Sequence, residues 1–328
     1  MRPRVAIRFP ARPRLPAPSL LAGALLAAVL LAAVSAPAIS AEPPAARPSP
    51  ATRDFEARCA APGVVKCVGF DALADFRSGQ VNPSADGRTR PVMDSKIHAS
   101  GEGSLRFEIP SRSPANSSGY WADALGARFG EGKVLYLQFR QRFSREMLET
   151  RYREEGGWKQ FILYQAGPSC TSVQLVAVNQ YLRGLPILYA ACGEDGLFVE
   201  QSDGDHLIQQ GDFRCYRRDP RPGDCAMYVP DQWMTFYFQV DVGHYGKPDT
   251  RVQGWIGTGP GKLRQFIKYP GLTLNYADQP DEAFDQLQFT PYQTDKDPRQ
   301  DHPVAYTWYD ELIVSRLPIA APAYVDAP

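Results

Sequence analysis

The sequence has no excess charge of either sign. Its 328 residues include 36 Lys and Arg and 36 Asp and Glu, so the formal net charge is zero. Five of the arginines lie in residues 1–41, which hold no acid, and the rest of the chain has 31 basic and 36 acidic residues. A nucleic-acid-binding protein needs a broad cationic surface. The charge balance therefore argues against nucleic acid as a partner.

Long hydrophobic runs are scarce. The composition, 44% hydrophobic and 22% charged, is that of an ordinary globular protein and excludes a disordered chain, a collagen-like repeat and a polytopic membrane protein. The sustained apolar run at Leu20–Val34 has 15 residues, whereas a bilayer-spanning helix needs roughly 20. Arginines precede this run, and small residues up to Ala41 follow it, as in an export signal. We expect residues 1–41 to be a signal peptide, with an uncleaved membrane anchor as the alternative.

Metal-binding cysteine patterns are missing. No CxxC pair occurs, and no histidine lies near a cysteine pair, which argues against a zinc site. All six cysteines follow the signal, so in a secreted or periplasmic protein they favour disulfides. Six cysteines allow fifteen pairings, of which the simplest joins sequence neighbours: Cys59–Cys67, Cys170–Cys192 and Cys215–Cys225.

Common catalytic motifs are absent as well. The sequence has no GxSxG elbow, HExxH motif, P-loop or GxGxxG motif, and its four histidines are scattered. No expected strand carries the carboxylate pair of a glycosidase, since Asp310 and Glu311 are adjacent and would face opposite ways. We expect no cofactor. A structural calcium ion remains an alternative, and loop oxygens such as those of Asp203, Asp205 or Asp241 would hold it.

Helical periodicity is rare, and alternation of apolar and polar residues dominates. Residues 42–56 are rich in Pro and Ala and predict a flexible leader, and Arg145–Glu155 is the best short helix candidate. Alternating stretches predict strands with one core face and one wet face, most clearly at Val134–Phe143, Met234–Val242 and Gln286–Tyr292. Many short strands without intervening helices favour a β-sandwich or jelly roll. We expect a single all-β domain of two antiparallel sheets over residues 57–328.

The wet faces of these strands carry amides, arginines and aromatic hydroxyls. Planar amides and guanidinium groups make directional hydrogen bonds to hydroxyls and carboxylates, and aromatic rings suit the apolar faces of sugars. Such a set predicts carbohydrate binding, although each residue alone could be an ordinary outer-face residue. The set comprises Gln138, Arg140, Arg142, Gln239, Gln286, Gln288 and Tyr292, with Gln253 and Trp255 as further candidates.

The order of strands resembles a known family. The terminal run Tyr306–Ser315, with Trp158-Lys159-Gln160 and Trp233–Phe236, resembles concanavalin-A-like jelly rolls of the alginate lyase and heparin lyase I type. Leu105–Pro110 is similar to the first part of the family's arginine strand, with Pro110 in place of the second arginine. Gln286–Tyr292 is similar to its late tyrosine strand, with Gln288 at the lysine position. Gln165 stands near the place of the family's histidine.

The resemblance implies cleavage of a uronic-acid-containing polysaccharide by β-elimination. In that reaction a donor neutralises the uronate carboxylate, a base removes the C5 proton and an acid protonates O4. The resemblance suggests Tyr292 as acid and base, Arg106 and Gln165 as carboxylate neutralisers, and His302 as a further catalytic candidate. The expected substrate-binding residues are Arg140, Arg142, Lys159, Gln138, Gln288 and Tyr120.

Two other functions remain open. One is a non-catalytic carbohydrate-binding jelly roll, and the other is a glycoside hydrolase or a structural envelope protein of the same fold. For all of them the expected partner is a glycan, an acidic polysaccharide in the case of the lyase. We expect a monomer that does not contact the membrane once the signal is removed.

Overall fold

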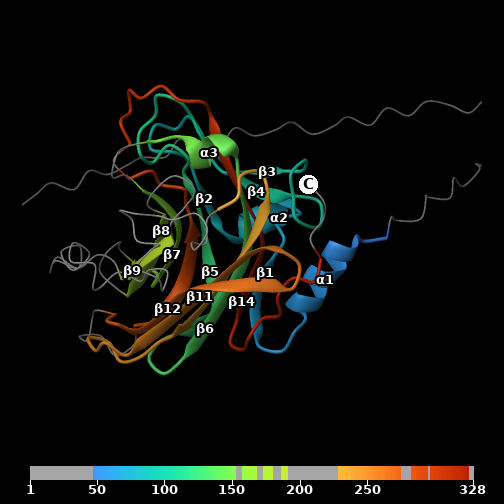
Figure 1. The fold of residues 1–328 in the computed structure, drawn as a ribbon, viewed down its shortest axis with the longest axis vertical. Helices are drawn as coiled ribbons and strands as arrows, with labels where there is room; N and C mark the ends of the chain where they lie inside the picture. Colours follow the sequence, from blue (N-terminus) through green and yellow to red (C-terminus); the bar gives the residue numbers. More distant parts are fainter. Residues whose placement is uncertain are drawn as a thin grey trace, which may run out of the picture. The chain divides into compact units, whose positions relative to one another are not determined.

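Two antiparallel sheets stack face to face in this protein (Figure 1). The computed structural model describes residues 47–152, 157–167, 173–179, 186–190, 228–274, 282–294 and 296–324, with only the backbone for 186–190. These residues belong to one compact unit that begins at Arg47. The expected all-β sandwich is therefore confirmed.

The larger sheet, sheet A, has eight strands among the described residues. Its order is β12-β11-β10-β6-β14-β4-β3, and β1 pairs with β14 beside this path. The strands are β1 (Val64–Val68), β3 (Val92–Asp94), β4 (Ser104–Ile109), β6 (Val134–Phe143), β10 (Trp233–Asp241), β11 (Thr250–Gly259), β12 (Lys262–Leu272) and β14 (Ala305–Ser315). Strands β12 and β3 therefore lie at opposite edges of sheet A.

The smaller sheet, sheet B, has six strands in the described ranges, in the order β2-β5-β13-β7-β8-β9. They are β2 (Gln80–Asn82), β5 (Tyr120–Phe129), β7 (Trp158–Tyr164), β8 (Gln174–Asn179), β9 (Pro186–Ala190) and β13 (Phe284–Phe289). Three short helices complete the described elements: α1 (Pro50–Cys59), α2 (Leu73–Ser78) and α3 (Arg145–Glu149).

The predicted strands are largely confirmed. Val134–Phe143 matches β6 at both ends, and Met234–Val242 differs from β10 by one residue at each end. The third strand is shorter than predicted, because β13 ends at Phe289 and leaves Tyr292 beyond it. Pro291 has no N–H group for a strand ladder, which favours an early end. The helix expected at Arg145–Glu155 is shorter than predicted, because α3 ends at Glu149 and Thr150 already has an extended backbone; residues 153–156 lie outside the described ranges.

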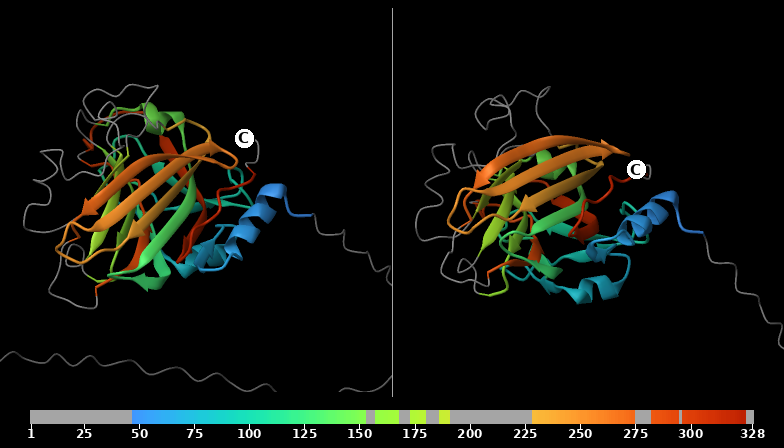
Figure 2. Two further views of the ribbon diagram at one scale, coloured as in Figure 1. Left: turned by 60° about the horizontal axis from the view of Figure 1, so that its bottom comes forward. Right: turned by 90° about the horizontal axis from the view of Figure 1, so that it is seen from below.

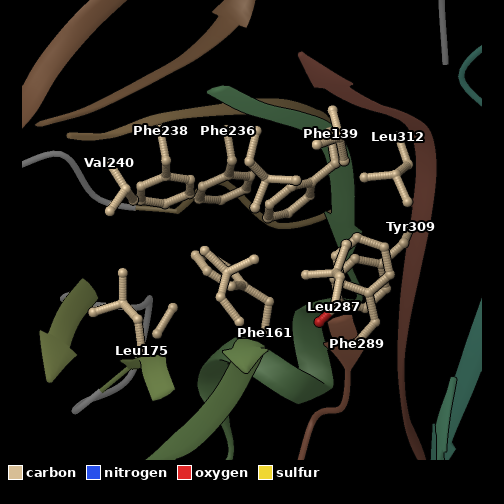
Figure 3. Packing of buried hydrophobic residues seen from close by; sticks show 14 of the residues in the cluster. Phe139, Phe161, Leu175, Phe236, Phe238, Val240, Leu287, Phe289, Tyr309 and Leu312 are labelled. Atoms are coloured by element: carbon tan, nitrogen blue, oxygen red, sulfur yellow. The ribbon is translucent and has the colours of Figure 1, made fainter. Parts of the chain in front are cut away.

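Aromatic side chains from both sheets fill the interior. Phe139 of β6 lies 5.8 Å from Phe161 of β7 and 5.1 Å from Phe289 of β13, measured between ring centroids. Phe236 and Phe238 of β10 extend the same layer, as Figure 3 shows. Burying each such ring stabilises the fold by about 1.5–3 kcal/mol. The core thus fixes which faces of the two sheets point outward.

Helix α1 corrects the prediction of a flexible leader over residues 42–56 from Pro50 onward, whereas residues 42–46 lie outside the described ranges. The side chain of Ser49 accepts a hydrogen bond from the Thr52 N–H (3.1 Å), and Pro50 occupies the first helical turn. Both features favour a helix start, which the surrounding Pro/Ala-rich composition conceals. Phe55 is buried with Ile313 and Ile319 on the outer face of sheet A. The helix lies outside the sheet layers in Figure 2.

The C-terminal segment lies beside α1. The N–H of Ala323 donates to a carboxylate oxygen of Asp54 (3.2 Å), and the Pro322 carbonyl accepts from the Gly261 N–H (2.7 Å). A disulfide joins Cys59, the last residue of α1, to Cys67 of β1 and confirms the first expected pairing. The other four cysteines lie outside the described residues. Within those residues, no helix combines the length and the apolar character that crossing a membrane requires.

Candidate functional site

The outer face of sheet B forms the strongest candidate site. Phe161, Leu163, Leu287 and Phe289 lie in the core, so the alternate residues of β7 and β13 point outward. Gln288 of β13 lies between Ala122 of β5 and Ile162 of β7 in the strand register. The outward-facing polar and aromatic residues of these three strands include Tyr120, Arg128, Lys159, Tyr164, Gln286 and Gln288.

A bulge in β7 turns Lys159 toward this face. The pairing with β8 shifts register between Lys159 and Phe161, so Gln160 is an extra residue. Gln160 is fully buried, and its amide donates to the side-chain oxygen of Gln141 on sheet A (2.7 Å). Its backbone carbonyl accepts from the Tyr309 hydroxyl (2.7 Å). These bonds fix the bulge, and the bulge orients Lys159.

Lys159 meets Tyr292 at the end of β13. The Lys159 N–H donates to the Tyr292 carbonyl (2.9 Å), and Lys159 Nζ lies 4.9 Å from the centre of the Tyr292 ring. Burial lowers the pKa of Lys159, because an apolar environment disfavours the charged ammonium. A lysine with a lowered pKa releases its proton more readily and can act as a general base. The Lys159 amine, with its pKa below the ordinary value, therefore lies over the ring of Tyr292.

Tyr120 is the first residue of β5 on the same sheet. It follows Gly119, whose φ of +69° lies in the left-handed region, and a Cβ there would come within 2.1 Å of the Asn82 carbonyl oxygen. The Gly119 carbonyl accepts a hydrogen bond from the hydroxyl of Thr290, just after β13 (3.2 Å). Glycine is needed at this close approach, which holds the start of β5 against the end of β13.

Gln165 lies at the other end of β7. Its side-chain oxygen accepts from the Ala283 N–H (3.0 Å), before the start of β13. Six residues separate Gln165 from Lys159, which is roughly 20 Å along a strand. Tyr164 lies at the same end, where burial, followed by the nearby Tyr120 and Asp285, raises its pKa. The structure therefore does not place Gln165 beside Tyr292 as a carboxylate neutraliser.

Arg106 lies on the other sheet. It belongs to β4, pairs with Trp308 of β14 and Val92 of β3, and faces outward from sheet A. Its Nη1 donates to a carboxylate oxygen of Asp94 (3.3 Å). The structure therefore does not bring Arg106, the other predicted carboxylate neutraliser, to Tyr292, because sequence alternation identifies an outward face without identifying its sheet.

The predicted ligands on β6 also belong to sheet A. Gln138 and Arg140 are fully buried beneath α1, where Arg58 Nη1 donates to the Gln138 side-chain oxygen (2.7 Å) and Arg140 Nη1 lies 3.5 Å from Glu311 Oε1. Both are inaccessible to a polysaccharide, which corrects their expected substrate-binding role. Arg142 is half-buried on the same outer face, and desolvation lowers its pKa.

His302 occupies a loop apart from the pair. It is buried, with its ring centroid 5.1 Å from that of Tyr152, and its Nδ1 is 2.7 Å from the Pro303 carbonyl oxygen. Burial, with a contribution from the charge of Lys296, lowers the pKa of His302. No hydrogen bond or ring contact among the described residues joins it to Lys159 or Tyr292. Its catalytic role stays a prediction.

The wet strand faces therefore do not form one shared site. Lys159 contacts Tyr292 on sheet B, and Gln288 and Tyr120 lie on strands of the same sheet, whereas the predicted arginines lie on sheet A. Lys159 was predicted only as a ligand. Its position as the single cation in the apolar run from Trp158 to Leu163 is a signal for a desolvated base.

The described part of the chain contains no group of three or more His, Cys, Asp or Glu that could hold a metal ion. Of the calcium candidates, Asp203 and Asp205 lie outside the described residues. Asp241 is described, and its carboxylate accepts a hydrogen bond from Arg251 Nε (3.0 Å). The Asp241 carboxylate is thus paired with an arginine, and a structural calcium ion stays an open alternative.

Comparison with known proteins identifies the fold. No protein-family model and no curated protein matches this sequence. An alginate lyase of Aplysia kurodai does match in structure, with a TM-score of 0.51, 13% identity, and coverage of 76% of this chain and 98% of that chain.

Two further structures are similar at lower TM-scores. An endo-β-1,4-glucuronan lyase from the fungus Trichoderma reesei has a TM-score of 0.45, 13% identity, and coverage of 74% of this chain and 97% of that chain. An immunostimulatory antigen and pseudo β-1,3-glucanase of Mycobacterium tuberculosis has a TM-score of 0.44, 13% identity, and coverage of 77% and 98%. At such identities a likeness concerns the fold alone: the chain is a jelly-roll β-sandwich built like that of the Aplysia alginate lyase.

Proposed function

We propose that this protein is a secreted lyase that cleaves a uronic-acid-containing polysaccharide at the outer face of sheet B. The observation that carries the proposal is the contact between Lys159, whose pKa is lowered, and Tyr292 (4.9 Å). β-Elimination needs a base and an acid within reach of adjacent sugar atoms. An amine and a phenol side by side supply both.

The reaction follows from these two groups. The neutral amine of Lys159 takes the C5 proton of a uronate, and the electron pair forms the double bond between C4 and C5. The bond from C4 to O4 breaks, and the Tyr292 hydroxyl protonates the departing O4. The Gln288 amide on the same face donates a hydrogen bond to the uronate carboxylate, and Tyr120 offers a ring for sugar stacking.

The test is to incubate the purified protein with alginate, glucuronan and heparin-type glycans while following the ultraviolet absorbance of the unsaturated product. We expect product from at least one glycan, and its loss in Lys159→Gln and Tyr292→Phe. Lys268→Gln is a matched control, because Lys268 is exposed on β12 of the other sheet. No unsaturated product from any of the glycans would overturn the proposal.

A second candidate is a non-catalytic glycan-binding jelly roll. The observation that favours it is the location of Arg106 on β4 of sheet A, so that this predicted carboxylate donor does not lie beside Lys159 and Tyr292. It predicts saturable glycan binding that survives Tyr292→Phe, with neither unsaturated products nor new reducing ends.

A further inference from the structure

A second polar site lies on sheet A, near its β3 edge. A hollow of about 220 Å³ opens there. Ligand pockets commonly measure about 300–1,000 Å³, so this volume suits one sugar unit rather than a length of chain. The residues that line it are Arg88, Thr89, Arg90, Val92, Arg106 and Glu108. Three cationic side chains thus face one carboxylate in the lining.

Arg106 is the least exposed of the three cations. Its Nη1 donates to Asp94 Oδ2 (3.3 Å), and its guanidinium carbon lies 5.5 Å from the centre of the Tyr306 ring. Its Nε is buried and has no hydrogen-bond partner among the described residues. The side chain nevertheless remains 35% exposed. Arg106 is therefore held from one side and retains unused donors.

Asp94 is an ionised anchor for Arg106. Burial alone would raise the pKa of Asp94, but hydrogen bonds from the Trp308 indole N–H and the Lys96 N–H, together with the charge of Arg106, hold it below its usual value. Because the anchor stays charged, the orientation of Arg106 persists across the neutral pH range.

The other two arginines differ in their attachments. Arg88 Nε donates to an Asp86 carboxylate oxygen (2.5 Å), and its Nη2 donates to the Arg112 carbonyl (2.9 Å). Arg90 is exposed and makes no hydrogen bond or ion pair with the described residues. Arg90 thus retains all its donors, and guanidinium donors bind carboxylates in a two-pronged geometry.

We propose that this hollow binds a carboxylate of an acidic glycan, at a site separate from Lys159 and Tyr292. The choice of glycan rests on the proposed function, whereas the preference for an oxyanion rests on the three arginines. Glu108 in the lining weakens the attraction of the hollow for a small, highly charged anion. Its carboxylate can accept hydrogen bonds from the hydroxyl groups of a sugar. A chain held on sheet A would raise the local concentration of substrate for sheet B.

The test is calorimetric titration of the full chain with oligoglucuronate, a neutral cello-oligosaccharide and inorganic sulfate as separate probes. The variants are Arg90→Gln, which breaks no contact with the described residues, and Arg90→Gln combined with Arg106→Gln. The matched control is Lys262→Gln combined with Lys268→Gln, two exposed cations on β12 at the opposite edge of sheet A. Both double variants remove the same charge.

We expect the arginine double variant to bind oligoglucuronate at this site about ten- to a hundredfold more weakly, as for the loss of charged hydrogen bonds. The lysine control should bind like the original protein, and cello-oligosaccharide should not bind at this site. Unchanged oligoglucuronate binding in the arginine variants overturns the proposal, as does sulfate binding there without oligoglucuronate binding. The lyase proposal is tested separately, by the loss of unsaturated product in Lys159→Gln. Calorimetry and the product assay therefore distinguish failure of this binding site from failure of the lyase proposal.

Discussion

Lys159 Nζ lies 4.9 Å from the centre of the Tyr292 ring, and the backbones of the two residues are joined by a hydrogen bond of 2.9 Å. The contact depends on the β7 bulge at Gln160, whose side chain is bonded across the core to Gln141. The bond between Gln160 and Gln141 joins the two sheets and also orients Lys159, so the packing of the sandwich determines the geometry of the candidate site.

Lyase activity should rise with pH through the pKa of Lys159. Burial places this pKa below 10.5, and the neutral amine is the form that accepts a proton. Lys159→Gln should lose this rise and reduce the rate by about 10²–10⁴. A pH–rate profile of unsaturated product for both proteins measures the effect. A profile in Lys159→Gln that keeps the same rise would assign the base elsewhere.

Breaking the ion pair under α1 should destabilise the fold strongly. Arg58 and Glu311 are bonded to each other and are 4% and 1% exposed. Arg58→Met leaves Glu311 buried with Arg140 as its nearest cation at 3.5 Å. We expect the free energy of unfolding to fall by about 3–5 kcal/mol, measured by urea denaturation.

Arg53→Met provides the control for Arg58. Arg53 lies on the same helix, and among the described residues its side chain donates only to the Pro48 carbonyl, in an exposed position. An exposed substitution of this kind should change the unfolding free energy by less than about 0.5 kcal/mol. Equal losses in the two variants would show that helix propensity, rather than the buried pair, determines the stability.

Removing the disulfide should loosen the chain near α1. Cys59 and Cys67 are eight residues apart, and closing a loop of that length contributes about 2.5 kcal/mol through the entropy of the unfolded chain. The double variant Cys59→Ser, Cys67→Ser should lose that amount in denaturant unfolding. It should also expose the amides of α1 to hydrogen exchange, and unchanged exchange there would contradict the role of the bond in holding α1.

Asp310 should make stability depend on pH. The side chain is fully buried and accepts hydrogen bonds from the Ala99 and Glu311 N–H groups, at 2.6 and 2.7 Å. Burial, followed by the charge of Glu311, raises its pKa well above 3.8. The folded protein then keeps a proton that the unfolded chain releases, so the free energy of unfolding falls as pH rises from 3.8 toward the folded-state pKa.

Asp310→Asn is the matched test of that dependence. The amide keeps an acceptor oxygen for the Ala99 N–H but cannot ionise. Denaturation at a series of pH values should give a shallower slope for the variant over this range. Identical slopes for the two proteins would place the responsible proton on another group.

The strands were predictable because alternation is a local property of the chain. Leu135, Leu137 and Phe139 mark the inner face of β6 in the sequence alone, and all three are buried. The same alternation made Gln138 and Arg140 appear exposed, since nothing in β6 indicates that α1 covers its outer face. Burial of an outward face depends on a contact 80 residues away, between Arg58 and Gln138.

The candidate site was predictable only in part. Tyr292, Gln288 and Lys159 were chosen from strands that prove to be neighbours, because β13 pairs with β7. Arg106 was chosen by the same logic but lies on β4, which pairs with β14 in the other sheet. The assignment of strands to sheets depends on long-range pairing, which residue patterns within one strand do not encode.

The hydrogen bond between Ala323 and Asp54 brings distant parts of the chain to one place on the surface. Proximity of this kind allows a short linker to join the two segments without disturbing either sheet. New ends can then be opened at the exposed turn around Gly132, where an added side chain would meet no atom within 4 Å. The sandwich is therefore a suitable scaffold for circular permutation, with α1 joined to the segment that follows β14.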